Sequence, residues 1–275
     1  MIAACLKWVD RRPEIDPLDA HVRTDARTAG ASPADEAALE WALRAGEATG
    51  RPVLAVSAGP PAAEAVLRQA LAAGASRAAL VPLTGTEPSD AVARALAAVL
   101  RDAGVTLVWC GDHSLDRGSG SVPAYLAAEL GLAQGLGLVE VHVDPRGPLT
   151  GLRRLDRGRR ERVSLTGEGV LSVEGATAHL RRATLAAARW ARTAPVDRCG
   201  PAPADGAAAE PTLRPFRPRA RVLPAPVGAE ALERIAALTD AGTVKAHREV
   251  VTLAPADAAA RLLDAVASWG YDLPG

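Results

Sequence analysis

The residues with the clearest chemical potential form a small-residue loop at residues 111–122. This loop follows the apolar run at residues 105–109 and precedes a segment rich in alanine and leucine, an order typical of a buried strand that leads into a helix. Pro123 stands in the first turn of that expected helix, where its missing N–H is tolerated. The backbone N–H groups of Ser119, Gly120 and Ser121 are then free to converge on an anion at the positive end of the helix. A nucleotide phosphate is the anion that we expect.

Strand and helix patterns alternate through the first half of the chain. Strands are predicted at residues 2–6, 53–57, 78–81 and 106–110, and helices at residues 33–49, 62–73, 89–103 and 124–130. The strands are too apolar to face water, so we expect a doubly wound α/β fold with a mainly parallel sheet that is covered on both faces. The loops at residues 7–12, 57–61 and 111–122 should gather at the carboxyl edge of this sheet, where such folds bind ligands.

After residue 135 the pattern changes. Four more strands are predicted at residues 138–143, 151–156, 162–165 and 170–174. Residues 194–228 are rich in proline, alanine and glycine and are expected to form an extended arm, and residues 255–269 form an amphipathic helix. We therefore predict a nucleotide-binding domain at residues 1–193, and at residues 194–275 a linker and C-terminal arm that pack on a partner subunit.

Composition narrows the class of protein. The formal net charge of the 275 residues is zero, but residues 1–150 hold 13 basic and 18 acidic side chains whereas residues 151–275 hold 19 and 14. Such segregation favours a protein partner over nucleic acid. Neither a disulfide framework nor a metal site is expected from three cysteines without ligand spacing, and no apolar run is long enough to insert into a membrane. These patterns predict a soluble, cytoplasmic protein.

Several segments resemble, in the same order, the beta (small) subunit of electron transfer flavoproteins. They are Lys7 after the first strand, residues 32–40, residues 56–75, residues 111–130, an Arg-x-x-Asp-x-Gly segment within residues 153–161, and residues 183–185 at the place of a partner-recognition loop. The resemblance covers roughly residues 1–195. It implies a heterodimer in which an alpha subunit holds most contacts to a redox-active FAD, while the beta subunit binds AMP and presents a surface loop to flavin dehydrogenases.

The resemblance also assigns residues. Its docking anchor is Leu185, and it implies an electron carrier without catalytic residues that passes electrons towards a membrane quinone oxidoreductase. The implied nucleotide-binding residues are Cys5, Ser32, Pro33, Ala34, Asp35, Ala58, Gly111, Asp112, His113, Ser114, Leu115, Asp116, Arg117, Gly118, Ser119, Gly120, Ser121 and Val122.

Some positions depart from the family pattern and leave alternatives open. His113 and Ser121 stand where glutamine is common, and Gly118 replaces a frequent aspartate. The nucleotide is therefore either AMP or, as in electron-bifurcating members, a second FAD. A stand-alone adenine-nucleotide-binding module of the universal stress protein type is the other reading, although the long arm after residue 194 favours the first.

Individual residues have two readings as well. Asp116 either contacts the nucleotide or caps a turn, and Leu185 is either an exposed anchor or a core position of a short helix at residues 184–191. An arginine run either forms a solvated hairpin face or meets an acidic partner; its members are Arg153, Arg154, Arg157, Arg159, Arg160 and Arg162.

Overall fold

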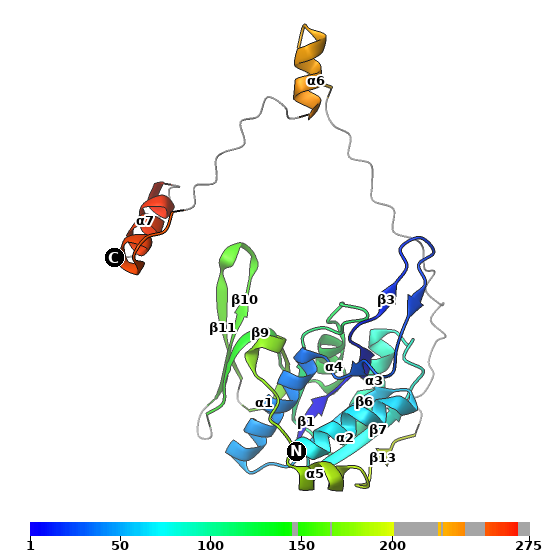
Figure 1. Ribbon diagram of the computed structural model, residues 1–275. Helices are drawn as coiled ribbons and strands as arrows, with labels where there is room; N and C mark the ends of the chain where they lie inside the picture. The colour runs from blue at the N-terminus through cyan, green and yellow to red at the C-terminus, as the bar shows by residue number, and fades with distance from the viewer. Residues whose placement is uncertain (145–147, 166, 201–224, 227, 240–250, 269–275) are drawn as a thin grey trace. The chain divides into compact units, whose positions relative to one another are not determined.

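The computed structural model describes residues 1–144, 148–165, 167–200, 225–226, 228–239 and 251–268 (Figure 1). The chain divides into two units, Met1–Phe216 and Arg217–Gly275. In the second unit the described elements include the helices α6 (Ala231–Thr239) and α7 (Pro255–Ser268). α7 was predicted, although its expected last residue, Trp269, lies outside the described residues. α6 was not predicted.

A nine-stranded sheet forms the centre of the first unit. Its strands lie in the order β11-β10-β9-β12-β8-β1-β6-β7-β13. In this order all neighbouring strands from β9 through to β13 are parallel, whereas β10 is antiparallel to both of its neighbours, β11 and β9. The doubly wound, mainly parallel α/β fold is thus confirmed. The strands are β1 (Ile2–Cys5), β6 (Val53–Gly59), β7 (Arg77–Pro82), β8 (Leu107–Gly111), β9 (Gln134–His142), β10 (Leu149–Arg154), β11 (Arg160–Leu165), β12 (Gly169–Val173) and β13 (Asp197–Arg198).

Helices cover both faces of this sheet. On one face lie α1 (Pro33–Thr49), α2 (Glu64–Ala73) and α5 (Leu185–Ala191), and on the other lie α3 (Ser89–Asp102) and α4 (Val122–Leu130) (Figure 1). Successive residues of a strand point to opposite faces. In β1, Ile2 and Ala4 accordingly pack on the α1/α2 side, whereas Ala3 and Cys5 pack on the α3/α4 side.

The order of the strands creates a ligand crevice. From β1 the chain adds β6 and β7 on one side and then crosses to place β8 on the other side of β1. The connections on either side of this reversal leave the sheet on opposite faces, so the carboxyl ends of β1 and β8 border an opening. The predicted loops at residues 7–12 and 111–122 lie at the ends of β1 and β8 on this edge. β6 continues to Gly59, so only the last two residues of the loop predicted at residues 57–61 follow it.

Smaller elements complete the first unit. The chain between β1 and α1 forms two short antiparallel pairs: β2 (Val9–Asp10) with β5 (Ala29–Gly30), and β3 (Glu14–Ile15) with β4 (Val22–Arg23). In Figure 1 the β3–β4 pair and the tip of the β10–β11 hairpin extend away from the rest of the first unit. Short 3₁₀ turns occur at Pro61–Ala63, Asp156–Gly158 and Gly175–Thr177.

The first unit continues beyond residue 193, where its predicted boundary fell. Strand β13 pairs with β7 at the edge of the sheet, so residues 197–198 are part of the sheet and not of a free linker. Among the described residues, no helix is both long enough and apolar enough to cross a membrane.

Candidate nucleotide site

A pocket opens at the carboxyl edge of the sheet, between the starts of α3 and α4. It holds about 810 Å³ of empty space, counting the part that is open to solvent. Of the predicted binding residues it is lined by Cys5, Asp35, Ala58, Gly111, His113, Ser114, Arg117, Ser119, Gly120, Ser121 and Val122. The other predicted residues do not line it; they are Ser32, Pro33, Ala34, Asp112, Leu115, Asp116 and Gly118.

The loop before α4 exposes backbone to this pocket. Gly118 and Gly120 have φ angles of 67° and 59°, a left-handed conformation that glycine adopts without strain. A Cβ atom on Gly120 would lie only 2.4 Å from the carbonyl oxygen of Asp112, so this position admits no side chain in the present backbone. The hydroxyl groups of Ser119 and Ser121 lie 3.1 Å apart in the same loop.

The amino end of α4 borders the same pocket, because Val122 and Pro123 line it. α4 begins at Val122, two residues before its predicted start, and the Ser121 side chain does not cap it. The first N–H groups of a helix carry no intrahelical acceptor, and the helix dipole adds positive potential there. This end of the pocket therefore suits an anionic oxygen cluster such as a phosphate.

Asp35 ties together three chain segments behind the pocket. Ser32 caps α1 as predicted, because its hydroxyl oxygen accepts the Asp35 N–H at 3.0 Å. The Asp35 carboxylate accepts the Lys7 N–H at 3.1 Å and also the backbone N–H groups of Gly111 and Ser32. Burial outweighs these hydrogen bonds and raises the pKa of Asp35 to about 6. The ends of β1 and β8 are thus fixed to the start of α1.

Asp116 does not line the pocket itself, but it pairs with Lys7, which does. Its carboxylate accepts the Arg117 N–H at 2.9 Å and forms an ion pair with Lys7 at 2.6 Å. Burial alone would raise the pKa of Asp116, but the hydrogen bonds from Lys7 and Ser114, together with the charge of Lys7, lower that pKa. The two predicted interpretations of Asp116, a nucleotide contact and a turn cap, both stay predictions. His113 is bonded locally too, with Nδ1 2.9 Å from a carboxylate oxygen of Asp112.

One wall of the pocket was missed by the sequence reasoning. The loop after β7 contributes Gly85 and Glu87, and Arg117 reaches across to hydrogen bond with the carbonyl oxygens of both, that of Gly85 at 3.1 Å. The signal was present, because this loop also follows the carboxyl end of a predicted parallel strand. The other lining residues absent from the prediction are Leu6, Lys7, Ser89, Val92, Leu96, Cys110 and Pro123.

Leu185 lies outside the pocket, at the first position of α5. Thr184 caps this helix through its hydroxyl group, which accepts the Ala187 N–H at 3.1 Å. The predicted short helix therefore exists, but Leu185 is 77% exposed and is not one of its core positions. Trp190, on the same helix, is 52% exposed.

The arginine run forms the predicted hairpin of β10 and β11. Arg153 pairs with Glu161 across the two strands, and Arg154 lies 3.6 Å from a carboxylate oxygen of Glu174. Arg157 at the tip has a φ of 59°, which is uncommon for a residue with a side chain. Within the described residues, Arg157 and Arg160 form no ion pair.

Comparison with known proteins identifies the family of this chain. The model of the electron transfer flavoprotein domain matches residues 21–203 of the 275-residue chain. The chain belongs to this family. Electron transfer flavoproteins are electron carriers, so this chain works with other redox proteins. The match includes most of the pocket and all of α5, whereas the search of curated proteins found no match.

Proposed function

We propose that the chain is the beta subunit of a heterodimeric electron transfer flavoprotein. In this role it binds an alpha subunit, with which it shares a redox-active FAD, and it helps to carry electrons from flavin dehydrogenases towards a membrane quinone oxidoreductase. The observation that carries the proposal is the pocket within the matched family domain. It brings the carboxyl ends of four parallel strands, β1, β6, β7 and β8, together beside the uncapped start of α4.

The residues of the pocket fit AMP. The phosphate would be held by backbone at residues 119–121 and by the start of α4, where Gly120 leaves the approach free of a side chain. Apolar side chains would surround the adenosine, since Cys5, Ala58 and Val92 line the remaining wall. The protein supplies binding and orientation, and the flavin, when bound, supplies the redox chemistry.

The α5 surface is the proposed contact for dehydrogenases. Leu185 projects from a capped helix, and Trp190 adds a second exposed apolar side chain on the same helix. Exposed leucine and tryptophan side chains bury much apolar area when they enter a partner's pocket, and aromatic anchors often dominate such interfaces. This surface is separate from the nucleotide pocket, so docking and nucleotide binding can be altered independently.

The test is to co-express the chain with its alpha subunit and count ligands in the purified complex. One FAD and one AMP per heterodimer are the expected result. Two FAD and no AMP would instead indicate a bifurcating member. A chain that binds adenine nucleotide but neither flavin nor an alpha subunit would contradict the proposal and favour a stand-alone module of the universal stress protein type.

A further inference from the structure

Two cysteine side chains lie beside each other in the pocket. Cys5 in β1 and Cys110 in β8 are register partners on adjacent parallel strands. Because register partners point to the same face of a sheet, both belong to the core on the α3/α4 side, and both line the pocket. Both are free thiols.

The placement of these thiols permits a bond between them. Neighbouring strands lie about 4.8 Å apart, which is within the range of Cα separations that disulfides bridge. The two side chains also interact directly, since the Cys5 thiol is the largest cause that raises the pKa of Cys110, followed by burial. Cys110 is therefore held as a protonated thiol, and Cys5, which is 8% exposed against 4% for Cys110, is the sulfur that a small molecule in the pocket reaches first.

We propose that Cys5 and Cys110 form a redox-modifiable dithiol site that a small peroxide entering the pocket converts into a disulfide across β1 and β8. In the first step the Cys5 sulfur attacks one peroxide oxygen, the O–O bond breaks, and the leaving hydroxide takes up the proton of the Cys5 thiol to become water. In the second step Cys110 sulfur attacks the resulting sulfenic acid of Cys5, the S–O bond breaks, and the oxygen leaves as a second water with the proton of Cys110. Two thiols and one hydrogen peroxide thus give one disulfide and two waters.

A disulfide between directly opposed parallel strands should be easy to reduce. The two Cβ atoms of such a pair point in nearly the same direction, so the bond forms with strain, and strained disulfides have more oxidising potentials. We therefore expect a reversible modification, in contrast to a permanent structural cross-link. The inference does not depend on the proposed function, because the bond is detected in the chain itself.

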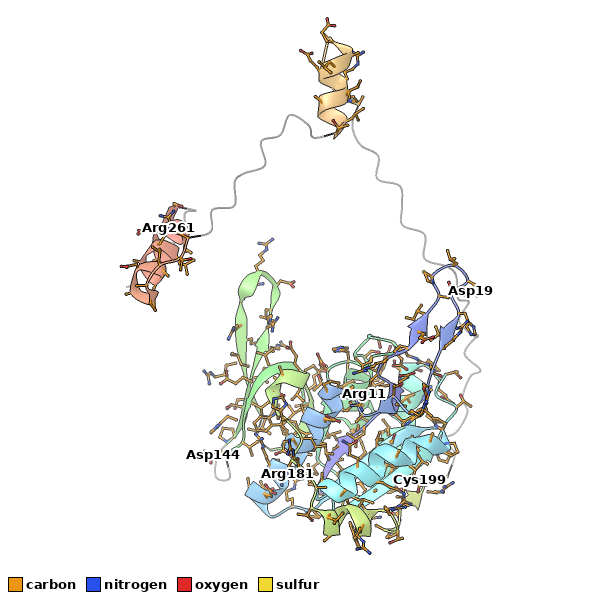
Figure 2. The ribbon with its side chains drawn as sticks, in the orientation of Figure 1. Arg11, Asp19, Asp144, Arg181, Cys199 and Arg261 are labelled. Atoms are coloured by element: carbon orange, nitrogen blue, oxygen red, sulfur yellow. The ribbon has the colours of Figure 1, made fainter. Side chains whose placement is uncertain are left out.

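The third cysteine supplies a control within the same chain. Cys199 follows β13 at the far edge of the sheet, and its N–H donates to the Leu80 carbonyl oxygen at 3.0 Å (Figure 2). The strands β6 and β7 separate β13 from β1, so Cys199 cannot reach the pair without unfolding. Cys199 is half-buried.

The experiment treats the full-length chain with hydrogen peroxide, blocks free thiols with an alkylating reagent in denaturant, and maps the peptides. We expect the number of alkylated cysteines to fall from three to one, with a single peptide pair joined through Cys5 and Cys110. A dithiol reductant should restore all three. Cys199→Ser should still form the bond, whereas Cys5→Ala should leave Cys110 fully alkylatable.

Several results would overturn the proposal. These are a bond that involves Cys199, a bond between two chains, or oxidation that leaves both Cys5 and Cys110 alkylatable while Cys199 is modified. If Cys5→Ala does not fold, the peptide maps of the wild-type chain and of Cys199→Ser still decide the question, because both chains keep Cys5 and Cys110.

Discussion

The two faces of the central sheet use the same strands for different purposes. On the α1/α2 face, Ala4 and Trp109 pack into a closed core, whereas their chain neighbours Cys5 and Cys110 line an open pocket on the α3/α4 face. Strand alternation therefore separates a stabilising surface from a binding surface within two residues of chain. Substitutions on the closed face should change the free energy of unfolding, and those on the open face should change ligand binding.

Large side chains fill the closed face. Trp109 stacks on Trp41 with ring centroids 6.2 Å apart, and the Arg44 guanidinium lies 4.9 Å from the centroid of the Trp41 ring. The indole N–H of Trp41 donates to the Thr177 hydroxyl at 3.2 Å, which fixes α1 to the turn after β12. On the α3/α4 face the neighbouring residues Cys5 and Cys110 are small, which leaves room for a ligand.

The largest loss in the free energy of unfolding is expected from a substitution on the closed face, at Glu40 in α1. Its side chain is only 5% exposed and accepts hydrogen bonds from Arg44 and from Arg181, which joins α1 to the segment before α5 (Figure 2). Burial alone would raise the pKa of Glu40, but the hydrogen bonds from Arg181 and Arg44 lower it, so the carboxylate stays charged. Glu40→Ala should lower the free energy of unfolding by about 3 kcal/mol, because it removes hydrogen bonds to two charged arginines, each worth about 1.5 kcal/mol or more.

Glu47 gives a matched control for this prediction. It pairs with the same Arg181, but its side chain is 63% exposed. Glu47→Ala should cost less than about 1 kcal/mol. Both values come from urea unfolding, and equal losses for the two variants would show that burial of Glu40 adds nothing.

The second effect concerns Asp35, which belongs to α1 but also lines the open pocket. Its pKa is raised to about 6, so the folded state disfavours the charged form, and its contribution to stability should fall as pH rises from about 4 to 7. Asp35→Asn does not titrate. The unfolding free energy of the wild type minus that of the variant should therefore decrease over this range, by up to about 3 kcal/mol. A difference that stays constant with pH would contradict the raised pKa.

The third effect is on the open face, at the left-handed Gly120. Gly120→Val would place a Cβ 2.4 Å from the Asp112 carbonyl oxygen and would force the loop to rearrange. We expect AMP affinity, measured by titration calorimetry, to fall at least tenfold. Gly118→Ala is the control, because Gly118 has a similar φ of 67° but no atom within 4 Å of its Cβ and no place in the pocket lining. Unchanged affinity in Gly120→Val would exclude this loop as the phosphate site.

Local sequence signals predicted the parallel core and much of the pocket. Apolar runs and the Ser32 cap were sufficient for β1, β6, β8 and α1, and the small-residue loop identified residues 119–121. The loop after β7 could have been predicted from its place after a parallel strand, whereas its contact with Arg117, which reaches Gly85 from a distant segment, could not. No local pattern encodes such contacts.

The same limit applies to Asp35 and to the C-terminal segments. The sequence marked Asp35 as a first-turn acid of α1, but its bonds to Lys7 and Gly111 exist only once β1 and β8 are paired. The short strand β13 was hidden in a proline- and alanine-rich stretch, because two residues at a sheet edge leave no periodic signal.

The smallest effect on stability is expected at Leu185, which belongs to neither face of the sheet. Because its side chain is 77% exposed, Leu185→Ala should leave the melting temperature and the flavin content of the complex nearly unchanged. Electron transfer from the partner dehydrogenase should nevertheless slow at least several-fold, since truncating an interface hot spot costs about 2 kcal/mol or more of binding. Leu67→Ala is the opposite control, because Leu67 is fully buried in α2 and its truncation should cost about 2–5 kcal/mol of stability. An unaltered transfer rate in Leu185→Ala would remove α5 from the docking surface, whereas a large loss of stability would show that Leu185 packs against a part of the molecule that covers it in solution.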